Sequence, residues 1–302
     1  MLENLRWDLY RTFLAVLEEG SLSAAARSLA LTQPTVGRHI SELESALGLS
    51  LFTRSQTGLL PTDAARALQD DAQAMRGIAA ALERTGCGFS AGICGTVRIS
   101  ASEIVGVEVL PPILAGLQAA HPGLNFELVL SNKVQDLLRR EVDIAVRMTA
   151  PKQEVLLATR VGDIPVALHA HQNYIERHGL PTSLADLESH VLIGYDQETP
   201  YLRAARAAYP FWSRANFALR CDSDLAQLAL IRAGAGIGIC QVALAQKNPH
   251  LVPVLSELFT LKLTTWVVMN EGLRNSTRFM TTFKGLVQGL RQYTQTPMNQ
   301  VK

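Results

Sequence analysis

The chain has 302 residues, of which 48% are hydrophobic and 18% charged. It carries enough apolar material for packed cores, and its length predicts two or three folded domains. The 28 Lys and Arg residues nearly balance the 27 Asp and Glu residues, and a net charge of +1 excludes a polybasic protein that binds nucleic acid by bulk charge. No apolar stretch reaches the roughly 18 residues of a membrane helix, and the charged N-terminus lacks a signal-peptide core, so we expect no membrane association and a cytoplasmic location.

Two short helices are predicted at the start of the chain. The first spans 7–18 and ends at Gly20. The second spans 24–30, and Ser21 or Ser23 is its candidate cap. The alanines of this second helix allow close packing against a neighbouring helix.

The third predicted helix, from about Pro34 to Leu47, divides its surface into two faces. Pro34 suits the first helical position, and Thr32 or Gln33 can cap the helix from outside. The apolar residues lie at helical spacing and are Val36, Ile40, Leu43 and Leu47. The opposite face carries Thr35, Arg38, His39 and Glu42. This pattern fits an ordinary amphipathic helix, and it also fits a recognition helix that reads the major groove of DNA.

A small β-hairpin is predicted directly after the third helix. Two short apolar runs, Leu51–Phe52 and Leu59–Leu60, flank a turn that contains Gly58. Arg54, at the base of this hairpin, is a candidate phosphate contact. The order of short helix, tight turn, amphipathic helix and hairpin favours a DNA-reading unit over an isolated amphipathic helix.

Residues 7–62 resemble the N-terminal winged helix-turn-helix domain of the LysR-type transcriptional regulators. The matching residues are Phe13, Gly20, Ser21, Ala24, Ala25, Ala26, Leu29, Thr32, Gln33, Pro34, Val36, Arg38, Ile40, Leu43, Glu44, Leu47, Gly48, Leu51, Phe52, Arg54, Leu60, Pro61 and Thr62. The resemblance implies that the third helix meets DNA in the major groove, with Arg54 at the wing. The candidate DNA-binding residues are Ser23, Thr32, Gln33, Pro34, Thr35, Arg38, His39 and Arg54.

The chain departs from this family pattern at two places. Gly37 stands where the family usually has serine, and Gln56 and Thr57 make the wing less basic than usual. Residues 1–62 contain five arginines, no lysine and six acidic residues, which gives a formal charge of −1. We therefore expect few phosphates to be neutralised by each subunit.

A long helix is predicted over 63–85, with Thr62 as its cap. Its small and apolar residues alternate at spacings of three and four, which is typical of a coiled-coil seam that joins two copies of the chain. The alternative is a helix packed on its own domain. The residues of this predicted dimerisation seam are Ala65, Leu68, Ala72, Met75, Ala79 and Leu82. Glycines then predict a hinge over 86–95.

From Gly95 onward, predicted strands alternate with predicted helices. The strands are expected at 97–100, 126–130, 143–147, 165–170, 191–195, 236–240 and 261–269. The helices are expected at 111–121, 133–140, 172–178, 183–188, 222–233 and 275–293. This alternation predicts an α/β fold with a parallel or mixed sheet and helices on both faces.

The region from 95 to about 293 resembles the effector-binding region of the same LysR-type family, which is itself similar to periplasmic binding proteins. The segments that carry the resemblance are 95–99, 110–112, 121–122, 137–146 and 233–239. Gln241 departs from the family, where proline is common at this position. The resemblance implies an effector domain over 95–302 with two subdomains, 95–163 with 264–302 and 164–263, and a ligand site between them.

Polar side chains follow the carboxyl ends of several predicted strands, where open α/β sheets bind ligands. The candidate ligand-binding residues are Ser100, Ser102, Ser131, Asn132, Arg147, Thr149, Tyr195 and Asp196. Hydroxyls, amides and one arginine suit a small anion such as a carboxylate. Glu103 would oppose an anion, or would recognise an amine. Helix capping is the competing explanation for each serine or threonine.

We predict no catalytic residue, no metal site and no cofactor, because no nucleophile, zinc or phosphate-binding motif is present. The predicted function is a ligand-responsive transcriptional regulator that binds an inverted repeat in double-stranded DNA as a homodimer or homotetramer. The alternative is a solute-binding or enzymatic α/β domain with a structural helical N-terminus. A redox role for Cys221 and Cys240 stays open.

Overall fold

The computed structural model describes residues 6–55, 58–86, 93–132, 142–151, 156–198 and 200–295. The chain forms two compact units, an N-terminal unit that extends to Gly86 and a C-terminal unit that holds the described residues from 93 onward. The predicted helix at 133–140 and most of the predicted hinge at 86–95 lie outside the described residues. Within the described part of the chain, no helix combines the length and the hydrophobicity that a bilayer crossing requires.

Three helices form the body of the N-terminal unit, and they are α1 (Trp7–Glu19), α2 (Leu22–Ser28) and α3 (Gln33–Leu47). The helix α2 lies two residues earlier than predicted, because Ser21 caps it: Ser21 Oγ accepts the Ala24 amide hydrogen at 3.2 Å. Thr32 caps α3 in the same way. The predicted apolar stripe of α3 is confirmed, because Val36, Ile40 and Leu43 are buried in one cluster with residues of α1 and α2.

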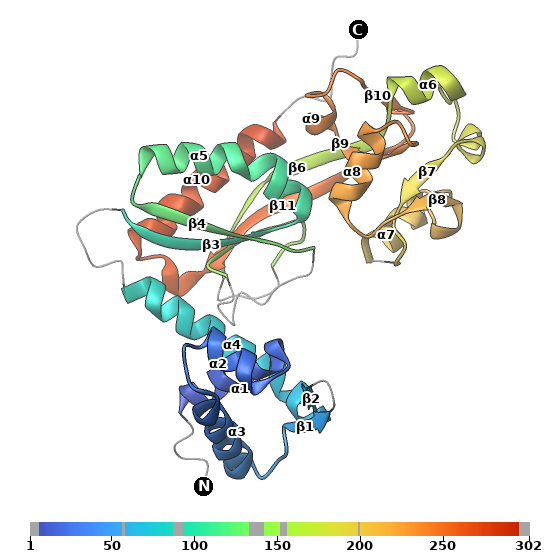
Figure 1. Cartoon of the computed structure of the whole chain (residues 1–302). Coiled ribbons are helices and arrows are strands. Elements are labelled where there is room, and N and C mark those ends of the chain that lie inside the picture. The colour runs from blue at the N-terminus through green and yellow to red at the C-terminus, as the bar shows by residue number, and fades with distance from the viewer. Residues whose placement is uncertain are drawn as a thin grey trace. The chain divides into compact units, whose positions relative to one another are not determined.

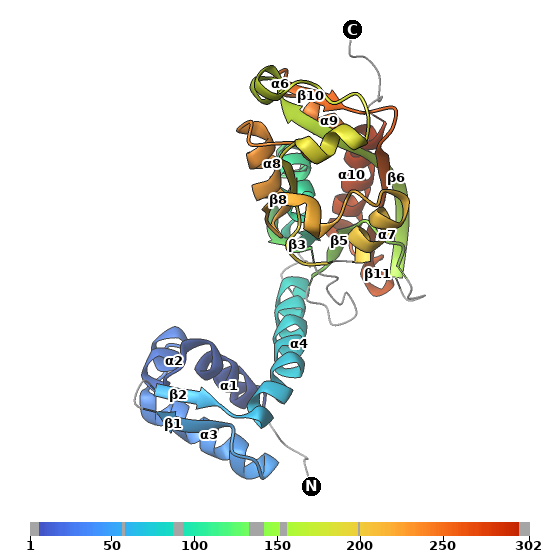
Figure 2. The ribbon, with the colours of Figure 1, turned by 90° about the vertical axis from the view of Figure 1, so that its right-hand side faces the viewer.

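The predicted hairpin is present as β1 (Phe52–Ser55) and β2 (Gly58–Pro61), which pair antiparallel with Arg54 opposite Leu59. It lies beside the helices of the N-terminal unit (Figure 2). The Leu59 amide donates to the Gly20 carbonyl at 2.8 Å, and a Cβ at Gly58 would lie 2.6 Å from that oxygen. Glycine at position 58 therefore lets the wing dock on the turn between α1 and α2.

The helix α4 (Asp63–Gly86) begins at the predicted cap, because Thr62 Oγ1 accepts the Ala65 amide hydrogen at 3.2 Å. Two residues of the predicted dimerisation seam, Ala65 and Ala72, are buried in the core of their own unit, as in the alternative of a helix packed on its own domain. Leu68 is half-buried against the same core. The seam residues Met75 and Leu82 are exposed, as is the apolar Ile78, which lies between them and was not predicted.

The C-terminal unit contains a seven-stranded mixed sheet with the order β10-β6-β11-β5-β3-β4, in which β9 pairs with β6. Its strands are β3 (Gly95–Ala101), β4 (Leu124–Leu130), β5 (Ile144–Arg147), β6 (Leu156–His171), β9 (Gly238–Gln241), β10 (Leu251–Val254) and β11 (Thr260–Asn270). The strand β3 pairs parallel with β4 and β5, and β11 pairs antiparallel with β5 and β6. The predicted mixed sheet is therefore confirmed.

Helices cover this sheet. The strands β7 (Leu192–Gly194) and β8 (Phe217–Arg220) pair in a second, two-stranded parallel sheet, which a bridge between Leu192 and Ile237 joins to the chain directly before β9. The helices are α5 (Leu110–Ala120), α6 (Gln172–His178), α7 (Pro200–Ala208), α8 (Asp224–Arg232), α9 (Val242–Ala245) and α10 (Thr277–Thr294). A π-helical turn at Val105–Val109 leads into α5. The helices α5 and α10 lie side by side (Figure 1), and a Cβ at Gly289 of α10 would lie 2.6 Å from the Ile113 side chain of α5.

The long strands β6 and β11 pair with each other along most of their length and connect two hydrophobic cores. The register between them shifts at Thr265/Trp266, opposite Gly162. One core surrounds Phe279 and Leu286 of α10, and a second core surrounds Trp212 and Phe259. We use the predicted bounds and call 95–163 with 264–302 subdomain I and 164–263 subdomain II. Ile164 and Leu263 nevertheless pack in the core of subdomain I.

The buried position of Ala72 generates a stability prediction. We expect Ala72→Leu to lower the free energy of unfolding of the N-terminal unit by about 1–3 kcal/mol, because three added carbon atoms must fit a packed core. Met75→Leu, at an exposed position of the same helix, is the matched control and should be nearly neutral. Thermal melts of the full chain at several protein concentrations measure both variants. A stabilised dimer in Ala72→Leu would contradict the packing described here and restore the predicted seam.

Candidate nucleic-acid interface and effector site

The N-terminal end of α3 presents a group of hydrogen-bonding side chains. Ser23 Oγ of α2 donates to Gln33 Oε1 at 3.0 Å, which leaves the NH2 of the Gln33 amide as its donor group for other contacts. Thr32 and Thr35 share a hydrogen bond between their hydroxyls at 2.8 Å. Arg38, one turn further along α3, is exposed. The structure thus brings together Ser23, Thr32, Gln33 and Thr35, with Pro34 exposed between them.

His39 lies on the same helix but is held by α1. Its Nδ1 atom is 2.9 Å from Thr12 Oγ1, and Thr12 is 1% exposed. The ring is half-buried, so its Nε2 atom is the ring nitrogen left for other contacts. The sequence pattern alone placed His39 on the free polar face and contained no signal for this contact.

Arg54 is exposed on β1, at the wing. Glu44 of α3 positions this strand, because its carboxylate accepts the amide hydrogens of Leu51 at 2.6 Å and Phe52 at 3.3 Å. These bonds tie the start of β1 to α3. The polar end of α3 and Arg54 together form a surface that can bond to base edges and phosphates.

In the C-terminal unit, Ser100 and Arg147 meet at the carboxyl ends of the parallel strands β3 and β5. Arg147 donates to Ser100 Oγ and to the Val146 carbonyl, each at 3.0 Å, and its Nε atom is buried without a partner. Burial lowers the pKa of Arg147. Among the described residues no carboxylate forms an ion pair with this guanidinium, which therefore suits an anionic ligand.

A second polar group joins subdomain I to subdomain II. Asn132 donates to Asp224 Oδ2 at 3.1 Å, and Tyr195 donates to Asp224 Oδ1 at 2.7 Å. Ser223 donates to Glu103 Oε2 at 2.7 Å. Burial raises the pKa of Asp224, and the nearby charge of Glu103 raises it further. The two carboxylates thus face each other across the subdomain boundary with neutral donors around them.

Two further contacts cross the same boundary. Arg232 of α8 forms an ion pair with Glu108 at 2.7 Å, and this pairing lowers the pKa of Glu108. Tyr293 of α10 donates to Gln241 Oε1 at 2.6 Å, where the family usually has proline. Sequence analysis missed Ser223 and Asp224, because a serine and an aspartate at the start of a helix are explained equally well by capping, and Ser223 does cap α8.

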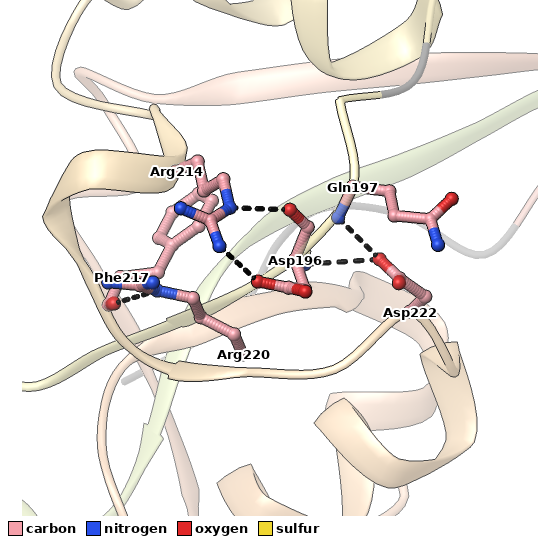
Figure 3. A network of polar contacts seen from close by, with 6 residues as sticks. All are labelled: Asp196, Gln197, Arg214, Phe217, Arg220 and Asp222. Carbon is pink, nitrogen blue, oxygen red and sulfur yellow. Dashed lines mark hydrogen bonds and ion pairs between the residues drawn. The ribbon is translucent and has the colours of Figure 1, made fainter.

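Asp196 lies in a separate network, within subdomain II (Figure 3). Its carboxylate forms an ion pair with Arg214 at 2.7 Å, and its backbone amide donates to Asp222 Oδ1 at 3.0 Å. These contacts hold the chain after β7. Asp196 is therefore occupied by structural contacts and is not brought to Arg147 by any contact of the described residues.

The remaining ligand candidates have different surroundings. Thr149 is exposed, and Ser102 and Ser131 are half-buried. Two cavities of about 570 Å³ and 450 Å³ lie along α10, and none of the eight candidate ligand residues lines either of them. The candidate ligand site is thus described by its polar contacts at the subdomain boundary.

Cys221 and Cys240, the two cysteines of the C-terminal unit for which the sequence left a redox role open, have free thiols. Cys240 is buried, and burial raises the pKa of its thiol to about 12. A thiol with so high a pKa is a poor nucleophile at neutral pH, which weighs against the redox role that the sequence left open.

Comparison with known proteins assigns both units. A family model described as "Bacterial regulatory helix-turn-helix protein, lysR family" matches residues 7–66. A model described as "LysR substrate binding domain" matches residues 90–289, which is more than half of the chain. The transcriptional activator AaeR of Escherichia coli (strain K12) is 30% identical over 183 residues, which cover 61% of this chain. The match spans 59% of the length of AaeR.

Solved structures share the fold over nearly the whole chain. CbnR, a LysR family regulator described in complex with its target DNA, is 20% identical with a TM-score of 0.68, and the match covers 96% of this chain and 100% of CbnR. The Vibrio cholerae virulence activator AphB is also 20% identical, with a TM-score of 0.62 and a coverage of 94% of this chain and 99% of AphB. The predicted winged helix-turn-helix and the predicted two-subdomain effector fold are therefore confirmed, and the chain belongs to the LysR family of bacterial regulatory helix-turn-helix proteins.

Proposed function

We propose that the chain is a sequence-specific DNA-binding transcriptional regulator whose activity is set by a small-molecule effector bound between subdomains I and II. The observation that carries the proposal is the exposed polar end of α3, backed by the buried stripe of Val36, Ile40 and Leu43. Family membership and the DNA complex of CbnR support the same function. The matching family model describes bacterial regulatory proteins, whose DNA lies in the cytoplasm, and we propose a cytoplasmic location on that ground.

We further propose that the active form is a homodimer, or a tetramer made of dimers, on an inverted repeat. The exposed apolar residues Met75, Ile78 and Leu82 lie on one side of α4, at spacings of three and four residues. Burying this stripe against a second α4 would remove apolar surface from water and give the complex two-fold symmetry. Two recognition helices related by that symmetry would match two half-sites about one DNA turn apart.

The effector is proposed to be a small carboxylate that pairs with Arg147 and Ser100. The Arg147 guanidinium donates to Ser100 Oγ and to the Val146 carbonyl oxygen, each at 3.0 Å, and its Nε atom is buried without a partner. An effector changes the regulator only if it binds one arrangement of the subdomains better than another. The contacts of Glu103 with Ser223 and of Asn132 with Asp224 are the ones that such a change would make or break.

The alternative function, a solute-binding or enzymatic α/β domain with a structural N-terminus, is not favoured. Family models match the N-terminal and the C-terminal region alike. Among the described residues, no group of three or more histidine, cysteine, aspartate and glutamate side chains is arranged to hold a metal ion. We propose that the chain has no enzymatic activity of its own.

DNA reading is tested with an operator selected from a pool of random duplexes by the full chain. We expect Arg38→Ala to weaken binding to that operator by about 1–3 kcal/mol in a gel shift, because an exposed arginine of α3 loses its base contact. Arg76→Ala is the matched control, because it removes an equal charge from an exposed ion pair on α4 of the same unit. Equal effects of the two substitutions would argue against base reading by α3, and failure to select any duplex would overturn the proposed function.

The effector class is tested by thermal shift against a panel of small carboxylic acids and matched amides. A ligand at about 100 times its Kd should stabilise the native state by roughly 2.7 kcal/mol. Arg147→Met should abolish this stabilisation, since it removes the guanidinium and keeps an apolar stem. Arg206→Gln, which breaks an exposed ion pair with Glu198 in subdomain II, should retain it. Stabilisation by the amides as strongly as by the acids would contradict the assignment of a carboxylate.

The buried carboxylate of Asp224 predicts a pH dependence of stability. Its folded pKa is raised above the ordinary value of 3.8, so its favourable contribution is complete below that pH and is lost as the pH rises through the raised pKa. Asp224→Asn removes this loss, and the stability of the variant relative to the native chain should increase from about pH 4 to 7. Urea unfolding followed by tryptophan fluorescence measures it, with the exposed Glu188→Gln as control. Parallel pH profiles for Asp224→Asn and the native chain would show that this carboxylate is not strained by burial.

A further inference from the structure

The contact between Thr12 and His39 defines which nitrogen of the histidine carries its hydrogen. Thr12 Oγ1 lies 2.8 Å from the Asp8 carbonyl oxygen and 2.9 Å from His39 Nδ1. A carbonyl oxygen only accepts, so the single hydroxyl hydrogen of Thr12 is donated to Asp8. The hydroxyl oxygen is then left to accept from His39. The Nδ1 atom therefore carries the hydrogen, and the Nε2 atom of the neutral ring has only a lone pair.

This arrangement limits what neutral His39 can bind. Phosphate oxygens accept hydrogen bonds, and an unprotonated Nε2 atom also accepts, so the neutral ring cannot bond to the DNA backbone. The imidazolium form donates from both nitrogens and can keep the bond to Thr12 while Nε2 donates to a phosphate. Histidine is the side chain whose charge ordinarily changes between pH 5 and 8. A phosphate contact through His39 thus requires a proton.

The place of His39 favours a phosphate over a base. Its half-buried ring is held toward α1 by Thr12, whereas the neighbouring Arg38 is exposed on the polar face of α3. The charged group that interacts with His39 from the α1 side is Asp8, which also interacts with Arg6 and Arg11, and Glu42 of α3 interacts with Arg6. Arg6 forms an ion pair with Asp8 at 2.6 Å and lowers the pKa of that carboxyl, so Asp8 stays ionised near the ring.

A positive charge gained at His39 should change the affinity for DNA more in this domain than it would in a strongly basic one. Residues 1–62 have a formal charge of −1, and each added positive charge at the DNA surface changes the attraction to the phosphates. His39 is also the sole histidine among residues 1–86 of the sequence, so a proton uptake near neutral pH by this part of the chain has one candidate histidine.

We propose that Thr12 is a positioning residue that locks His39 in the Nδ1–H form, so that duplex DNA binding takes up a proton at His39 Nε2 and weakens as the pH rises through neutrality. The proposal rests on the proposed DNA-binding function and adds a pH sensitivity to it. Thr12 acts through its hydroxyl alone, and it is buried away from the DNA-facing surface.

The test of the DNA contact uses the full chain and a mixed-sequence duplex of about 30 base pairs, because phosphate contacts are independent of sequence. Affinity is measured by fluorescence anisotropy at constant ionic strength between about pH 5.5 and 8.5. The dissociation constant should rise with pH, approaching about tenfold per pH unit for each histidine that takes up a proton. His39→Gln should remove the dependence, because its amide donates at every pH. A flat profile for the native chain, or an unchanged slope in His39→Gln, would overturn the proposal.

Two substitutions at Thr12 separate the lock from a structural role. Thr12→Val keeps the shape and frees the neutral ring to carry its hydrogen on Nε2, so the affinity at high pH should increase and the slope should flatten. Thr12→Ser keeps the hydroxyl and should retain the native slope. In a His39→Gln background Thr12→Val should have no further effect on the slope. A native slope in Thr12→Val would contradict the lock.

The tautomer itself is measured without DNA. Nitrogen-15 NMR of the histidine-labelled full chain at high pH should show a protonated Nδ1 and an unprotonated Nε2 for His39, with His39→Gln identifying the signals. A protonated Nε2 in the native chain would overturn the inference even if DNA binds. Failure to bind any duplex, together with the expected tautomer, would instead overturn the proposed function and leave the lock in place.

Discussion

The N-terminal unit depends on the burial of one stripe of α3. Val36, Ile40 and Leu43 pack against α1 and α2, and this packing determines which side of the helix faces outward. Burial of three aliphatic side chains stabilises this orientation by several kcal/mol, at about 1.5–3 kcal/mol for each side chain. The polar residues at the helix start can then be arranged for recognition, because the fold does not need them for its core.

Three side-chain hydrogen bonds around this stripe tie neighbouring elements to α3. Ser23 orients the Gln33 amide, Thr12 holds the His39 ring, and Glu44 ties the wing to the helix. Each of these bonds joins a different element to α3, so the surface that we propose to read DNA is assembled from side chains with restricted conformations. Restriction before binding lowers the entropy lost when the surface meets its partner.

In the C-terminal unit, the pairing of β6 with β11 is the contact that fixes the arrangement of the other elements. Both strands contribute residues to the two cores. The polar contacts at the subdomain boundary lie outside these cores, so they can change while the cores stay packed. Glu103 and Asp224 resist close approach by charge, whereas Asn132, Tyr195 and Ser223 favour it by hydrogen bonds. A balance of opposing interactions of this kind is sensitive to a bound ligand or a proton.

Sequence periodicity predicted the elements that bury a regular stripe, such as α3 and the strands around Ile99 and Val267. Periodicity could not predict the packing partner of Ala65 and Ala72, because the same spacing buries a stripe against α1 or against a second chain. It predicted only 165–170 for β6, since Gly162 and Asp163 resemble a turn, whereas pairing with β11 continues the strand through them. Arg147 and Ser100 were predicted together from strand order, but Thr12, Ser223 and Asp224 depend on tertiary contacts with no local signal.

The central claim is that the polar end of α3 is the surface that reads DNA. Site-specific photo-crosslinking tests it most directly, with a photoreactive amino acid placed at position 35 of the full chain and bound to a duplex selected by that chain. The account predicts crosslinks to bases within the half-sites, and none when the same amino acid is placed at the exposed position 180 of the C-terminal unit. A duplex that is bound tightly but never crosslinked from position 35 would contradict it.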